Sequence, residues 1–192
     1  MKFNQMIGAS LLLIGSAQFL VFLNLAEVLY PDYSISLNTI SDLGATCHSN
    51  ACVFVQPSSL IFNSSVVLLG AFIMLGSYFL FRDGKSKIFC SFLFLSGLGA
   101  IGVGAFTETT GSVHTLVSFI AFFFGGLAAI YSSRFLRTTL RYFSLAMGVI
   151  TLAALVLYGS DVYLGLGEGG MERMITFPVL FWGLAFAGNL LA

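Results

Sequence analysis

Apolar residues in this chain come in long continuous runs, separated by short polar segments. A run of about 20 apolar residues can cross the hydrocarbon core as an α-helix, which satisfies its own backbone hydrogen bonds. A transmembrane β-barrel would instead alternate apolar and polar positions. The pattern predicts an all-α integral membrane protein, with six transmembrane helices in a single domain over residues 1–192. The expected spans are Met6–Leu29, Ser58–Phe81, Ile88–Phe106, Val113–Ser132, Leu140–Tyr158 and Met174–Leu191.

Composition supports the membrane assignment. Of the 192 residues, 58% are hydrophobic and 8% are charged, and the mean hydropathy is +0.98. A soluble domain has about 25% charged residues, so these charges are too few to cover a water-facing surface. The formal net charge is zero, which gives no electrostatic basis for binding nucleic acid.

The basic residues predict the orientation in the cell membrane. All of them except Arg173 lie before the first span, between the second and third spans, or at the turn between the fourth and fifth spans. Lys and Arg in short loops mark the cytoplasmic face. We therefore expect both termini in the cytoplasm, and the connections 30–57, 107–112 and 159–173 on the extracytoplasmic side.

The first of these connections carries a short patterned segment. Pro31 ends the first span, because proline lacks an N–H and restricts the residue before it. Residues 34–43 then predict a short amphipathic helix at the membrane interface, closed by Gly44. Asn38 and Asp42 are four positions apart and would share its polar face.

Two cysteines follow in the same connection. Cys47 and Cys52 are expected outside the cytoplasm, where a disulfide persists, and a disulfide is the favoured interpretation. The alternative is a metal site that adds His48, although the spacing is not a strong zinc signature and another ligand is needed. We predict no cofactor, and a metal at these loops stays open as the alternative.

Asn63 lies close to the start of the second span. Asn63-Ser64-Ser65 matches a glycosylation sequon, but we expect it to enter the membrane, where modification does not occur. An amide at this depth is expected to line a pocket or to hydrogen-bond a neighbouring segment.

Glu108 and His114 flank the connection between the third and fourth spans. The connection is short, so we expect the two side chains to be within reach of each other. A histidine beside a carboxylate is a usual arrangement for a general base. The alternative is a histidine with purely structural hydrogen bonds.

The last connection is rich in glycine and ends in Glu172-Arg173. Glycine permits close backbone approach and unusual φ angles. Arg173 is the one cation expected on the extracytoplasmic face, so we expect it to pair with Glu172, Glu108 or Asp42. Its guanidinium is also suited to holding an anionic group, such as a lipid phosphate, through two hydrogen bonds.

Several stretches together resemble a known family. They are Tyr30–Ser34, Ile40–Gly44, Leu60–Ser65, Glu108 to His114, and Gly167–Met174 with Pro178 and Trp182. The chain resembles the mostly archaeal polytopic membrane family catalogued as domain of unknown function 998, over nearly its whole length. The resemblance implies a six-helix membrane protein and no established activity.

Three functional hypotheses follow. The first is an outward-facing polar pocket that binds an anionic lipid headgroup or a similar small ligand, in one form as a membrane-embedded hydrolase. Its catalytic candidates are His114, Glu108, Asp42 and Glu172, and its ligand-binding candidates are Arg173, Asn38, Asn63 and Tyr33. The second is a non-catalytic subunit of a larger membrane complex, with the polar residues as a structural ion-pair cluster. A transporter is weaker, because the span centres contain few ionisable residues.

Overall fold

The structure is a computed structural model that describes residues 3–48 and 51–192. Within these residues, six helices are long and apolar enough to cross a membrane, as the sequence predicted. They are α1 (Phe3–Val28), α2 (Ser58–Arg82), α3 (Lys87–Ala105), α4 (Ser112–Ser132), α5 (Thr138–Tyr158) and α6 (Gly167–Leu191).

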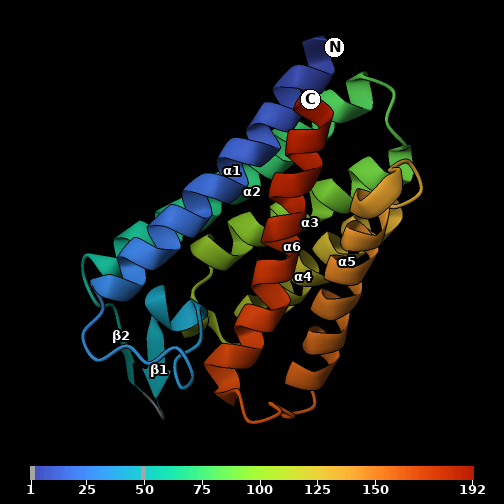
Figure 1. Cartoon of the computed structure of the whole chain (residues 1–192). Coiled ribbons are helices and arrows are strands. Elements are labelled where there is room, and N and C mark those ends of the chain that lie inside the picture. Colours follow the sequence, from blue (N-terminus) through green and yellow to red (C-terminus); the bar gives the residue numbers. More distant parts are fainter. Residues whose placement is uncertain (1–2, 49–50) are drawn as a thin grey trace.

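The helices form a closed ring. Each helix packs against the next one along the chain, and α6 returns to pack against α1 (Figure 1). Since the helices alternate in direction, α1 begins and α6 ends at the same end of the bundle. We call the opposite end, which carries the connections 29–57, 106–111 and 159–166, the disulfide end.

Small residues bring the helices of the ring close together. A Cβ atom added to Gly97 of α3 would lie 2.7 Å from the carbonyl oxygen of Gly70 in α2. At the end opposite the disulfide end, the Trp182 indole N–H donates to Ser132 Oγ at 3.0 Å and joins α6 to α4. Large apolar side chains such as Val21 and Leu60 are exposed outside the ring, as lipid contact requires.

The connection between α1 and α2 forms a compact cap at the disulfide end. It contains a 3-10 helix, η1 (Ser41–Leu43), and an antiparallel hairpin of β1 (Thr46–His48) and β2 (Ala51–Val53). Cys47 and Cys52 lie opposite each other in the hairpin and form a disulfide. The disulfide prediction is confirmed, and the metal alternative is wrong because it needs both sulfurs as free thiolates.

The helix expected over residues 34–43 is reduced to η1, preceded by turns. Side chains replace helical hydrogen bonds here: Asn38 Oδ1 accepts from the Ser34 N–H at 3.0 Å, and Asp42 Oδ2 accepts from the Thr39 N–H at 3.0 Å. Asn and Asp compete with helix in this way. The free backbone carbonyls of the turn bind α6 instead, as described below.

Helix α6 begins at Gly167, well before the predicted start at Met174. Glu172 and Arg173 therefore lie on the second turn of a helix, and the expectation of a loop there is wrong. Glycine is a poor helix former, so the glycine-rich sequence suggested a loop. Tertiary contact stabilises the helix, since the Gly169 N–H donates to the Ser36 carbonyl at 3.0 Å.

Candidate functional site

Arg173 is the centre of a buried polar cluster at the disulfide end. Its Nη2 donates to Glu27 Oε1 at 2.6 Å and to the Tyr33 hydroxyl at 2.8 Å, and its guanidinium lies 5.5 Å from the centre of the Tyr33 ring. Arg173 is 7% exposed. The partner is thus Glu27 on α1, and the prediction that Arg173 pairs with Glu172, Glu108 or Asp42 is wrong.

The second guanidinium nitrogen of Arg173 binds backbone. Nη1 donates to the carbonyls of Ile35 at 3.0 Å, Asn38 at 3.3 Å and Gly169 at 2.9 Å. Arg173 therefore ties α6 to the end of α1 and to the turn at residues 34–38. We call Arg173, Glu27, Tyr33 and these carbonyls the Arg173 cluster.

Tyr33 is a neutral member of this cluster. Its hydroxyl donates to the Thr39 carbonyl at 2.7 Å while accepting from Arg173. Burial raises the pKa of Tyr33 above its usual value, so the phenol keeps the proton that this donation requires.

The glycines of the last motif allow the turn to reach α6. A Cβ atom on Gly169 would lie 2.6 Å from the Ile35 carbonyl oxygen and would also meet the Asn38 carbonyl. Gly167 has a φ of +77°, and a side chain there would collide with Ser36. Both positions therefore require glycine.

Asp42 organises the next part of the cap. Besides the Thr39 N–H, its Oδ2 accepts from Asn38 Nδ2 at 3.1 Å, so the two side chains are in contact although the helix expected to carry both is reduced to η1. Asp42 is 9% exposed. The Thr39 hydroxyl in turn donates to Glu108 Oε1 at 3.3 Å and links the cap to the 3-10 helix η2 (Glu108–Thr110).

Asn63 supports the cap from α2. Its Nδ2 donates to the Gly44 carbonyl at 3.1 Å, and the Ser59 hydroxyl donates to the same carbonyl at 2.7 Å. Asn63 thus bonds a neighbouring segment, which was one of its two expected roles.

Glu172 precedes Arg173 on α6 and points to two cavities. It is 8% exposed, and its Oε2 accepts from the Ile40 backbone N–H. Glu172 lines two adjoining cavities, one at the centre of the ring and one at its side.

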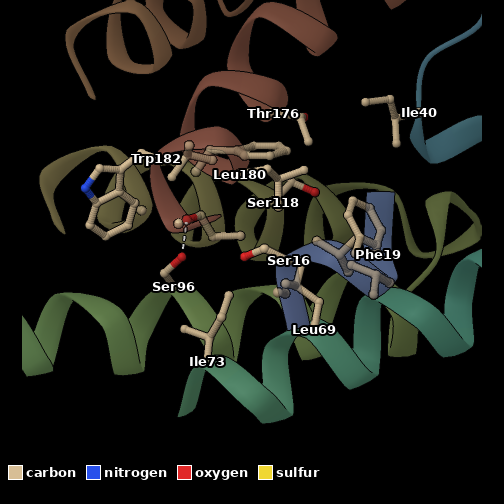
Figure 2. A pocket seen from close by; sticks show the side chains of 18 of the residues that line it. Ser16, Phe19, Ile40, Leu69, Ile73, Ser96, Ser118, Thr176, Leu180 and Trp182 are labelled. Atoms are coloured by element: carbon tan, nitrogen blue, oxygen red, sulfur yellow. Dashed lines mark hydrogen bonds between the residues drawn. The ribbon is translucent and has the colours of Figure 1, made fainter. Parts of the chain in front are cut away.

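The central cavity has a volume of about 90 Å³ and is mostly apolar. Figure 2 shows it between Phe19, Leu69 and Leu180, with Trp182 and Ile40 on opposite sides of the view. Its polar side chains include Ser16, Ser96 and Ser118, and the Ser96 hydroxyl donates to the Ala121 carbonyl at 2.8 Å. The cavity therefore lies where α1, α2, α3, α4 and α6 meet.

The side cavity is larger, about 550 Å³, and lies between α4, α5 and the start of α6. Ionisable or hydroxyl groups line its disulfide end, together with Leu155 and Val156 from the last turn of α5, and the rest of the lining is mostly apolar. The polar lining consists of Ser41, Glu108, His114, Thr115, Ser118, Tyr158, Ser160 and Glu172. The apolar lining includes Phe119, Phe122, Phe123, Leu152, Leu155, Val156 and Ile175. The two cavities share Ser41, Ser118, Phe122 and Glu172.

His114 occupies the first turn of α4 and has two hydrogen-bond partners. Its Nδ1 lies 2.7 Å from the Phe106 carbonyl oxygen, and its Nε2 lies 3.4 Å from the Ser118 hydroxyl. A carbonyl oxygen only accepts, so Nδ1 carries a proton, and in the neutral imidazole Nε2 then presents its lone pair to Ser118. In the described part of the chain, Glu108 and His114 line the same cavity without a hydrogen bond between them.

Glu108 has a partly buried carboxyl group at the cavity wall. Burial raises its pKa above the usual range, against the opposing effect of a hydrogen bond from Ser41. The carboxyl group is therefore easier to protonate than an exposed glutamate, and a protonated carboxyl can donate a hydrogen bond as well as accept one.

The structure divides the predicted site residues between two places. Glu108, His114 and Glu172 line the side cavity. Tyr33, Asn38 and Asp42 belong to the cap, and Arg173 and Asn63 bind it from α6 and α2. Among the described residues, no group of three His, Cys, Asp or Glu side chains is placed to hold a metal ion.

Sequence reasoning missed Glu27 and Ser118. A signal existed for Ser118, which is four positions after His114 in a predicted helix and so shares its face. No comparable signal identified Glu27, because its contact with Arg173 depends on α6 returning to α1.

The fold and the cavities define a multi-pass helical membrane protein with ionisable groups buried at one end of its bundle. The chain matches the family described as protein of unknown function (DUF998) over residues 13–189, and it belongs to that family. The resemblance found in the sequence is thereby confirmed. Neither a curated protein nor a solved structure matches the chain.

Proposed function

We propose that this protein binds an amphiphilic membrane molecule, such as a lipid, in the side cavity. The observation that carries the proposal is the division of this cavity of about 550 Å³ into a polar disulfide end and an apolar remainder. Ligand sites are commonly concave and mostly apolar, with a few polar groups that fix orientation. A polar headgroup would lie at Glu108, His114 and Glu172, and the chain would lie along Phe123 and Leu152.

The lining favours a neutral or cationic headgroup over the anionic one expected from the sequence. Glu108 and Glu172 line the side cavity, and no lysine or arginine is among its described lining residues. Arg173, the expected anion ligand, has both terminal nitrogens engaged within the Arg173 cluster. Hydroxyl or amine groups on the ligand would complement carboxyl and imidazole acceptors.

The position of the cavity supports entry from the membrane. Two of its apolar lining residues are exposed on the outside of the ring, Phe119 at 47% and Val156 at 68%. A molecule dissolved in the bilayer would reach the cavity between α4 and α5 without crossing the polar cap.

We also propose that the disulfide end faces away from the cytoplasm at the cell membrane. Two observations support this orientation. The Cys47–Cys52 disulfide needs an oxidising compartment, and Arg82, Arg134 and Arg141 lie at the opposite end of the bundle.

The Arg173 cluster favours a second candidate function, a non-catalytic subunit of a membrane complex. Its hydrogen bonds are internal and join α6, α1 and the cap, as a structural element would. In this case the protein would be isolated with stoichiometric partner chains and without a specific lipid.

Native mass spectrometry of protein extracted gently from its own membrane tests the proposal. Val156→Trp would obstruct the cavity, and Val149→Trp is its control, because Val149 lies two turns earlier on the same exposed face of α5 and does not line the cavity. We expect a bound lipid that Val156→Trp reduces at least about fivefold, which corresponds to about 1 kcal/mol of affinity. Equal lipid content in both variants would contradict the proposal.

A further inference from the structure

We propose that the side cavity hydrolyses a carboxylic ester of an amphiphile, with Ser118 as the nucleophile and His114 as its general base. This inference rests on the proposed function, because the same cavity must first bind the amphiphile. It adds a reaction, a substrate class and a catalytic residue to that binding site.

The relation between Ser118 and His114 carries the proposal. Both residues lie on α4, four positions apart, and the Ser118 hydroxyl is 3.4 Å from His114 Nε2. The 2.7 Å contact between His114 Nδ1 and the Phe106 carbonyl places the imidazole proton on Nδ1. The lone pair on Nε2 is then free to accept the hydroxyl proton of Ser118. A serine activated by an imidazole that a third group orients is the usual arrangement of a nucleophilic hydrolase.

Ser118 differs from other helical serines of this chain. The hydroxyls of Ser65, Ser77 and Ser132 each donate to the carbonyl three residues earlier, the ordinary role of serine within a helix. The hydroxyl of Ser118 instead faces an imidazole acceptor. Its hydrogen-bond partner thus differs from that of a helix-packing serine and is one that can accept the hydroxyl proton.

Ser118 is also placed where a substrate would be. It lines both the central and the side cavity, and Figure 2 shows it at the wall of the central one. An ester carbonyl at Ser118 would leave the larger part of the amphiphile in the side cavity and a short acyl group facing the central cavity. The apolar lining of both spaces suits an uncharged ester.

The reaction is balanced without a cofactor. Ser118 Oγ attacks the ester carbonyl carbon as its proton moves to His114 Nε2, and the tetrahedral intermediate expels the alcohol, which takes that proton. Water then attacks the acyl-serine ester, again giving its proton to His114 Nε2. The carboxylic acid leaves as Ser118 regains the proton. The N–H groups around Ser118 belong to the helix, so side chains alone would stabilise the oxyanion, and we expect slow turnover.

A fluorophosphonate probe, which phosphonylates activated serines, tests this assignment on the full-length protein in detergent. We expect labelling of the peptide that contains Ser118, lost by at least tenfold in Ser118→Ala and in His114→Ala. Ser133→Ala is the matched control, because its hydroxyl donates to the Ile130 carbonyl and lines neither cavity. Hydrolysis of a short-chain p-nitrophenyl ester should follow the same order.

Lipid retention by the same samples separates the two proposals. The wild-type protein could retain its lipid but neither react with the probe nor cleave the ester. This result would contradict the proposed hydrolysis and leave the binding proposal standing. Labelling that persists in Ser118→Ala would contradict the assignment of Ser118 as the nucleophile. Wild-type protein that retains no lipid would contradict the binding proposal and the inference that rests on it.

Discussion

Arg173 brings a full positive charge to a position that is 7% exposed. A buried charge is tolerated when it is paired and hydrogen-bonded, and Arg173 meets both conditions through Glu27, Tyr33 and the carbonyls of the cap. Replacing one partner leaves the other unpaired, whereas replacing both removes the cost of burying charge.

Arg173→Met is therefore expected to destabilise the fold by about 3–5 kcal/mol, because it leaves the Glu27 carboxylate without its partner. The double variant Arg173→Met/Glu27→Leu should recover part of that loss. Chemical unfolding in detergent micelles measures both. A single variant as stable as the wild type would show that the Arg173 cluster has no structural role.

Titration of Glu108 makes the stability of the folded protein depend on pH in a known direction. Burial raises the pKa of its carboxyl group in the folded state, so the folded state binds the proton more tightly than the unfolded state does. As pH rises from about 4.3, the usual glutamate value, through the raised pKa, this residue should reduce stability.

Glu108→Gln removes the titrating group and should become progressively more stable than the wild type over that pH window. Thermal melts of both proteins at several pH values between 4 and 8, on the order of one unit apart, test this expectation. A melting temperature of Glu108→Gln that falls relative to that of the wild type as pH rises would contradict the assigned direction.

Among the elements, α6 is the helix whose beginning depends most on contacts with a distant segment. Its first turns contact the backbone of the turn at residues 34–38, and Gly167 and Gly169 leave the space for that contact. The sequence predicted the six spans, because long apolar runs need no tertiary information. It missed the beginning of α6 and the turns at residues 34–40, because in both places partners distant in sequence replace local hydrogen bonds.

Gly169→Ala is expected to destabilise the protein by about 1–3 kcal/mol, since its Cβ would lie 2.6 Å from the Ile35 carbonyl oxygen. Gly188→Ala is the control on the same helix, where an added Cβ meets nothing within 4 Å. Alanine favours helix by about 1 kcal/mol over glycine, so the control should be neutral or stabilising. Equal effects of both substitutions in thermal melts would contradict the packing argument.

At the scale of the whole molecule, ring closure decides which residues meet. The candidate site could be predicted as far as its ionisable residues at one end of the bundle. The sequence could not show which of these residues belong to the cap and which line the side cavity, because that division depends on α6 packing between α1 and α5. The pairing of Arg173 with Glu27 follows from that closure and not from any local pattern.

The proposed orientation predicts which positions are accessible from outside the cell. Cys90 on α3 is a free cysteine, so we remove it with Cys90→Ser. In that background, Val162→Cys at the disulfide end should react with a membrane-impermeant maleimide in intact cells. Arg134→Cys, exposed at the opposite end, should react only after the membrane is permeabilised. The reverse pattern would invert the topology.

The closure of α6 on α1 also has a consequence for biosynthesis. Glu27 and the turn at residues 34–38 leave the ribosome long before Arg173 is made, and their partner is on the last helix. Until α6 inserts, the ring of helices is open and Glu27 has no partner. Insertion of α6 is therefore the step that closes the ring, and a chain truncated before α6 should be recognised by membrane quality control.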